Sequence, residues 1–233
     1  MTNISNWNLY YNKEGDEMVR ANLVYTPYVS PDKTTFCMSF NRDPAYHIYD
    51  YENVNWTEPD LIERFEKELE FHTRASKVMP TLAIKDVDHT NRKIFVEWYG
   101  DDFYMQGRVS GYDAVLPDWK TQWVDLVKKM WSQNIMKFSL HPNSWVANNG
   151  VLIPFNWFFC YDKAESNITI RNVLKQISYE RQEKLGVVLK DAGMDLDTPY
   201  NVKTLQQVAF NSFRSNYPAD LIDTIIQQHD FLH

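Results

Sequence analysis

The sequence predicts an α+β protein whose strands lie mainly in the first hundred residues and whose remainder is mainly helical. Short runs rich in β-branched and aromatic residues occur in the first 50 residues and are separated by proline and aspartate. An amphipathic helical pattern follows, and further helical patterns recur from residue 117 onward. A chain of 233 residues can bury one large core or the cores of two small lobes.

The N-terminal strands are predicted from three runs of this kind. Residues 21–25 and 34–40 are the first two, and they are separated by Pro27 and Pro31. Residues 45–49 are a third candidate.

The first helix is predicted to begin at Thr57, whose hydroxyl suits an N-cap. Asp60 follows three residues later, Pro59 lies in the first turn, and Pro80 ends the element. The residues expected on its buried face are Leu61, Ile62, Phe65, Leu69 and His72.

A hairpin and a second long helix follow. Residues 84–87 and 93–98 have the pattern of two paired strands, and residues 99–102 break that pattern. Residues 117–133 are predicted to be helical, with one apolar face made of Trp119, Trp123, Leu126, Val127 and Met130.

The stretch from residue 135 to residue 157 predicts a loop, a short strand, a tight turn and a second strand. Asn149 and Gly150 both tolerate the positive φ that a two-residue hairpin turn needs. The rest of the chain is expected to be mostly helical. Its apolar stripes are Ile170, Val173, Leu174 and Ile177; Leu205, Val208, Ala209 and Phe213; and Leu221, Ile222, Ile225 and Ile226.

Two short motifs flank this hairpin, Ser139-Leu140-His141-Pro142 before it and Phe155-Asn156-Trp157 after it. They resemble the Asp-Leu-His-Pro and Ile-Asp-Trp motifs of the protein-kinase-like fold, in the form found in aminoglycoside and choline phosphotransferases. The strand–strand–helix–strand–strand order and the long helix before the loop fit the same resemblance. It implies a two-lobed fold, with a β-rich N-lobe at residues 1–100 and a mainly helical C-lobe at residues 101–233. The hinge between them would be Glu97, Trp98 and Tyr99.

The charged positions of that family carry neutral residues in this chain. By the resemblance, the strand lysine falls on Ser39, or on Met38 if the register slips by one. The catalytic aspartate falls on Ser139, which cannot act as a base of matching pKa without help. The metal-binding asparagine and aspartate fall on Ser144 and Asn156, although magnesium prefers carboxylates.

The helix glutamate of the family would be Glu68, within Phe65-Glu66-Lys67-Glu68-Leu69. The alternative is that Glu68 is a solvated residue on an acidic helix. If the cleft has lost its charges, bulky side chains can fill it, so we expect Phe36 or Met38 to point inward. Glu68 should then lack a lysine partner and point to solvent or to an arginine.

We therefore expect a catalytically silent, kinase-like binding or regulatory protein with a protein partner, and no cofactor or metal. The first alternative is an active small-molecule or protein phosphotransferase that uses ATP and magnesium. Its relocated catalytic groups would be Glu68, Lys137 or Asp162, and the hinge residues would bind the nucleotide. The second alternative is a structural accessory protein that holds a partner through an exposed aromatic patch.

Composition restricts the remaining classes of function. A formal net charge of -7 and a pI of about 5.4 argue against a nucleic-acid-binding surface. The chain has no run of 18 apolar residues and no signal pattern, so we expect no membrane association and a cytoplasmic location. Cys37 and Cys160 lack motif spacing and are expected to be buried, reduced thiols. The spacing of histidines and cysteines does not match a zinc site. The aromatic content of 15% with seven glycines resembles that of small proteins carried by bacterial viruses, which would place the chain in the host cytoplasm.

Overall fold

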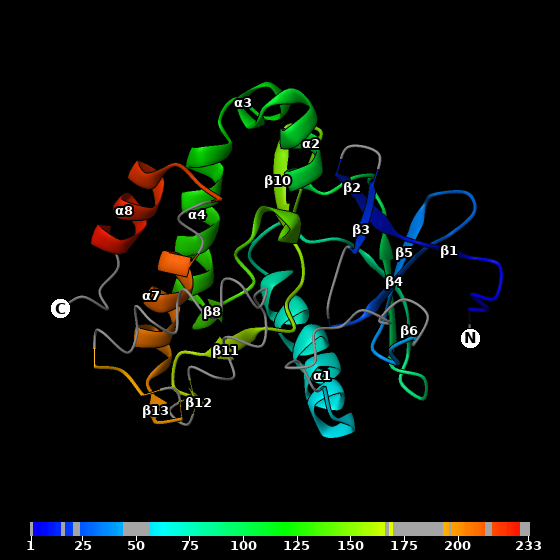
Figure 1. Cartoon of the computed structure of the whole chain (residues 1–233), viewed down its shortest axis with the longest axis horizontal. Helices are drawn as coiled ribbons and strands as arrows, with labels where there is room; N and C mark the ends of the chain where they lie inside the picture. The colour runs from blue at the N-terminus through cyan, green and yellow to red at the C-terminus, as the bar shows by residue number, and fades with distance from the viewer. Residues whose placement is uncertain are drawn as a thin grey trace. The chain divides into compact units, whose positions relative to one another are not determined.

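The computed structural model of the chain describes residues 2–14, 17–20, 24–43, 56–165, 168–169, 193–195, 197–212 and 216–228 (Figure 1). Helices and antiparallel sheets make up these residues, so the predicted α+β class is confirmed. The chain divides into two compact units. Unit 1 is Met1–Trp119 with Pro142–Phe158, and unit 2 is Lys120–His141 with Phe159–His233. The lobe boundary predicted between residues 100 and 101 stays a prediction.

Unit 1 contains a five-stranded antiparallel sheet with the strand order β1-β4-β5-β7-β6 (Figure 1). Its strands are β1 (Asn8–Leu9), β4 (Thr26–Val29), β5 (Thr35–Ser39), β6 (Ile84–Asp88) and β7 (Lys93–Glu97). A separate hairpin, β2 (Tyr11–Glu14) and β3 (Glu17–Arg20), lies between β1 and β4 in the chain.

The register of the central strands decides which side chains share a face of this sheet. Cys37 of β5 lies opposite Phe95 of β7, whereas Phe36 lies opposite Val96. Directly opposed residues of an antiparallel pair project to the same side, and successive residues alternate. One face therefore carries Cys37 and Phe95, and the other carries Phe36, Met38 and Val96.

The predictions for β5 and for the β6–β7 hairpin are confirmed, but the strand predicted at residues 21–25 is wrong in its described part. Val24 and Tyr25 lie in a bend, and the strand runs from Thr26 to Val29. Pro27 is accommodated in it because its carbonyl still accepts a hydrogen bond from the Tyr10 amide at 3.0 Å. Residues 21–23 and the candidate at 45–49 lie outside the described residues.

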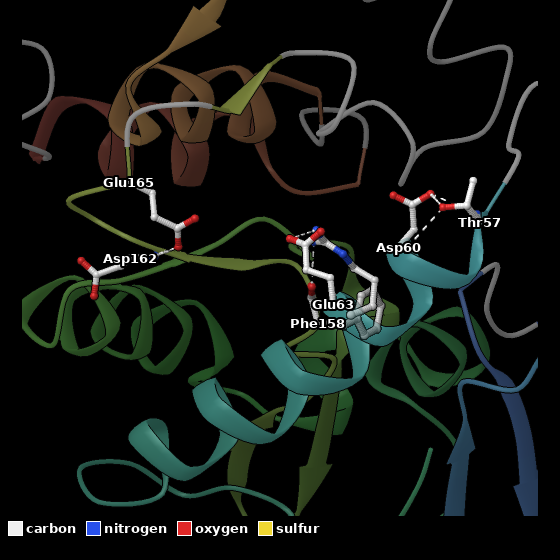
Figure 2. Close-up of polar contacts among 7 residues, drawn as sticks. Thr57, Asp60, Glu63, Phe158, Asp162 and Glu165 are labelled. Atoms are coloured by element: carbon white, nitrogen blue, oxygen red, sulfur yellow. Dashed lines mark hydrogen bonds and ion pairs between the residues drawn. The ribbon is translucent and has the colours of Figure 1, made fainter. Parts of the chain in front are cut away.

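Helix α1 (Glu58–Ala75) begins with the predicted capping box (Figure 2). The Thr57 hydroxyl accepts from the Asp60 amide at 3.4 Å, and the Asp60 carboxylate accepts from the Thr57 amide at 3.0 Å. The predicted buried face is right for Leu61, Phe65 and His72 and wrong for Ile62, which is 38% exposed. Two charged residues, Arg64 and Glu68, are buried in its place.

Two short helices follow β7, α2 (Phe103–Ser110) and α3 (Tyr112–Val115). Asp102 caps α2 because its carboxylate accepts from the Met105 amide at 3.0 Å. The rings of Phe103 and Tyr112 pack against each other with 4.8 Å between centroids. Both rings also contact Trp119, the first residue of the next helix.

Unit 2 contains most of the predicted long helix, α4 (Trp119–Ser132), and its apolar face is buried as expected. The other described elements are β8 (Ile135–Lys137), β11 (Cys160–Asp162), β12 (Ile168–Thr169), β13 (Pro199–Tyr200), α7 (Val202–Ser212) and α8 (Ala219–Gln228). The Trp123 ring of α4 packs edge-on against Phe210 of α7, with 5.9 Å between centroids.

The two C-terminal helices carry buried stripes where the sequence predicts them, at Leu205, Val208 and Ala209 and at Leu221, Ile222, Ile225 and Ile226. The stripe at residues 170–177 and Phe213 lie outside the described residues. In the part of the chain that the structure describes, no helix combines the length and the apolar character needed to cross a membrane.

Candidate functional site

The predicted hairpin after the long helix is present in unit 1. A 3-10 turn, η1 (Pro142–Ser144), leads into β9 (Trp145–Asn148), which pairs with β10 (Val151–Pro154). Asn149 and Gly150 form the turn with φ values of 49° and 76°. The positive φ at both positions is the geometry for which Asn-Gly is suited, so the prediction is confirmed.

Asn156, which follows this hairpin, is buried and hydrogen-bonded on both sides of its amide. Its Oδ1 accepts from the Tyr25 hydroxyl at 2.7 Å, and its Nδ2 donates to the Ser144 hydroxyl at 3.2 Å. Its own φ is 62°, a conformation that asparagine tolerates better than most residues. Tyr25, Asn156 and Ser144 are each at most 3% exposed. We call these three side chains the Asn156 network.

The Asn156 network does not fit a divalent cation. By the resemblance, Ser144 and Asn156 are the two metal-binding positions, but here their side chains bond to each other. Their donors and acceptors are neutral, whereas magnesium favours carboxylate oxygens in near-octahedral geometry. Within the described ranges, no three histidine, cysteine or acidic side chains come together as a metal site.

Aromatic rings surround the network and keep it in apolar surroundings. The Tyr25 ring packs against Phe36, Phe40 and Phe158, with centroid distances of 6.2, 5.6 and 5.7 Å. Phe36 in turn stacks on the hinge residue Trp98, with centroids 4.8 Å apart and planes at 17°. Such an environment strengthens a satisfied hydrogen bond and makes an unpaired charge costly.

The strand position expected to carry lysine is neutral on both faces of the sheet. Met38 lies on the same face as Phe36 and is 1% exposed. Ser39 lies on the opposite face, across from Thr26, and its hydroxyl donates to the Asn41 carbonyl at 3.1 Å. The face that carries the Tyr25–Phe36 contact therefore presents a thioether at Met38 and not a cation.

Glu68 does not point to solvent, so that part of the prediction is wrong. It is 1% exposed, and its Oε2 accepts from the backbone amide of Phe158 at 2.8 Å. Arg64, one helical turn earlier, donates from Nη1 to the carbonyl of the same Phe158 at 3.0 Å. The predicted role as a solvated helix residue fails because residues four apart share one face of α1, and this face is buried.

The hinge residues use their polar groups within unit 1. The Glu97 amide donates to the Ala83 carbonyl at 2.8 Å, and the Trp98 amide donates to the Thr34 carbonyl at 3.1 Å. The Tyr99 hydroxyl donates to the Glu97 carboxylate, and this bond raises the pKa of Tyr99 to about 12. These two backbone donors are therefore engaged in folding the sheet.

The other candidate residues belong to unit 2. Lys137 is fully buried in β8, and its carbonyl accepts from Gln206 Nε2 at 3.0 Å. Ser139 is 7% exposed. Asp162 organises a turn, because its carboxylate accepts from the Ala164 amide at 3.0 Å and its own amide donates to Glu165 at 2.8 Å (Figure 2).

The structure thus brings Ser144 and Asn156 together and joins Glu68 to the same segment, two residues beyond Asn156. Sequence reasoning missed three participants, Tyr25, Arg64 and Phe158. Arg64 carries a usable signal, because it lies four residues before Glu68 on a predicted helix. Tyr25 carries none, since 131 positions separate it from its partner.

No protein-family model matches this sequence, and no curated protein matches it. Among solved structures, the chain is similar to the crystal structure of Cex1p, with 11% sequence identity and a TM-score of 0.46. The likeness covers 97% of this chain and 40% of the Cex1p chain.

Proposed function

We propose that the chain is a kinase-like protein without phosphotransferase activity that acts by binding a protein partner. The order β4, β5, α1, β6, β7 in unit 1 supports the kinase-like part of this proposal. A long helix and the β9–β10 hairpin then follow in the order that the resemblance implies. The cytoplasmic location and the bacterial-virus source belong to the same proposal and rest on composition.

The Asn156 network is the single observation that carries the silent part. Phosphoryl transfer depends on metal ions that neutralise phosphate charge and on an oriented base. In the positions that the resemblance assigns to metal binding, an amide and a hydroxyl satisfy each other inside an aromatic cluster. A cation placed there would have to break this bond and would meet no negative charge from Ser144 or Asn156.

Two further contacts support the same proposal. Met38 supplies no charge on the relevant face of the sheet, and Glu68 accepts from the Phe158 backbone. The groups suggested for a relocated active site have structural surroundings, because Asp162 organises a turn and Lys137 is fully buried. We therefore keep the active phosphotransferase as the outcome that the experiment must exclude.

The test is thermal unfolding of the full chain with ATP and magnesium, with magnesium alone and with buffer alone. A ligand at about 100 times its Kd stabilises the native state by about 2.7 kcal/mol, so binding would be plain in the melting temperature. We expect no magnesium-dependent rise with ATP. Incubation with labelled ATP and candidate acceptors is the second arm. Transfer that disappears in Asp162→Asn would replace the silent protein by the active one.

A further inference from the structure

Both polar groups of the Phe158 backbone are bound by charged side chains of α1. Arg64 Nη1 donates to its carbonyl at 3.0 Å, and Glu68 Oε2 accepts from its amide at 2.8 Å. A residue in a sheet would obtain these two bonds from a neighbouring strand. Here a guanidinium and a carboxylate one helical turn apart supply them instead (Figures 1 and 2).

The burial of these charges indicates conformational specificity more than stability. Arg64 is 6% exposed and Glu68 is 1% exposed, although the rest of this helix face is mainly apolar. Removing two charges from water is costly, and an apolar pair of similar volume is often as stable. Charge-assisted hydrogen bonds in a buried site are nevertheless strong and directional. Only a backbone held in one orientation can take both.

Phe158 stands where the chain leaves unit 1, since Phe159 is the first residue of the following segment of unit 2. Two residues earlier, Asn156 has the φ of 62° that turns the chain after the hairpin. The Phe158 ring is 4% exposed and contacts Tyr25 and Phe40. The exit from unit 1 is therefore held at its side chain by aromatic rings and at its backbone by α1.

Arg64 also extends this arrangement to the surface of α1. Its Nη2 forms an ion pair with Glu63, whose side chain is 47% exposed (Figure 2). The guanidinium thus bridges a surface carboxylate and the buried Phe158 carbonyl.

We propose that Arg64 and Glu68 form a latch that fixes the chain at Phe158 in one backbone conformation without the help of a bound ligand. The latch orders the segment that follows the Asn156 network, and it ties that segment to α1. It rests on the proposed function only in that no nucleotide or metal takes part. A partner that displaces α1 would release the exit of unit 1.

The experiment is amide hydrogen exchange of the full chain, read at the Phe158 amide. The variants are Glu68→Gln, which keeps the shape and removes the charge, and Arg64→Met, which removes the donor to the carbonyl. Glu66→Gln is the matched control, because Glu66 is an exposed residue of the same helix. Losing a hydrogen bond to a charged group should speed exchange at Phe158 by about 10- to 100-fold.

The latch predicts that this acceleration is local. Amides of the central strands β5 and β7 should exchange at the wild-type rate in the same samples. The proposal is overturned if Phe158 exchanges no faster than in Glu66→Gln, or if the central strands accelerate equally. Arg64→Met keeps the test decisive if Glu68→Gln does not fold. Neither result depends on ATP, so the latch and the proposed function fail separately.

Discussion

Asn156 and Ser144 bind each other through a hydrogen bond of 3.2 Å between Nδ2 and Oγ, although the resemblance assigns both positions to the binding of metal ions. The Tyr25 hydroxyl closes the other side of the amide at 2.7 Å. All three side chains are buried, so water does not compete for these bonds. Substitutions in this network therefore probe whether a neutral structural cluster has replaced an ionic site.

Tyr25→Phe should destabilise the protein by about 1–2 kcal/mol, because it removes the donor to a buried amide oxygen and keeps the ring. Urea unfolding at pH 7 measures this loss. Tyr28→Phe is the matched control, since the Tyr28 hydroxyl bonds to Asp43 at a half-buried position. A smaller loss for Tyr25→Phe than for Tyr28→Phe would contradict a stabilising role of the Asn156 network.

Asn156→Asp should destabilise the protein at pH 7 by about 2–4 kcal/mol, because a carboxylate cannot donate to Ser144 and its charge would be buried among aromatic rings. The loss should shrink as the pH falls and the new carboxyl becomes neutral. Urea unfolding at pH 7 and pH 5, with and without magnesium, checks this. Recovery of stability by magnesium at pH 7 would argue that the site still suits a cation.

His72 should make the protein less stable in mild acid. Burial lowers the pKa of His72 from 6.5 to about 4, against an opposing hydrogen bond with the Leu82 backbone. The unfolded chain then binds a proton that the native state refuses, so stability declines as the pH falls from 6.5 to 4. The decline from this residue is at most about 3 kcal/mol.

Urea unfolding between pH 7 and pH 4 measures this slope. His72→Leu should flatten it, because the replacement removes the titrating group and remains apolar beside Trp157. His89→Gln is the control, since His89 is exposed. An unchanged slope in His72→Leu would show that other groups cause the acid sensitivity.

Cys37 and Cys160 should resist thiol reagents in the native protein. Both are free and fully buried, as the sequence analysis expected. Burial raises the pKa of the Cys37 thiol to about 12, so the reactive thiolate is scarce at neutral pH. A chromogenic disulfide reagent at pH 8 should label neither cysteine until urea unfolds the chain. Rapid labelling of one thiol before unfolding would mean that its strand opens locally.

Several elements could be predicted because their signals are local. Thr57 and Asp60 lie three residues apart and form the capping box of α1. Asn149 and Gly150 are adjacent and form the turn of the β9–β10 hairpin. In each case, backbone geometry follows from the conformational preferences of neighbouring residues.

The errors arose where tertiary contacts overrode a local preference. Tyr25 has a side chain typical of strands, yet it lies in a bend from which its hydroxyl reaches Asn156. Ile62 was expected on the buried face of α1, but Arg64 and Glu68 are buried there because the Phe158 backbone needs a donor and an acceptor. Apolar periodicity cannot reveal such a need.

By itself, the sequence determined the α+β class, the positions of α1, α4 and the β9–β10 hairpin, and the absence of charge at Met38, Ser144 and Asn156. Only the tertiary structure decided which groups these neutral residues bind. Asn156 meets Tyr25 across 131 positions, and Glu68 meets Phe158 across 90. Helices and turns follow from preferences within a few residues, whereas partners at such separations are set by how the core packs around the polar groups that it buries.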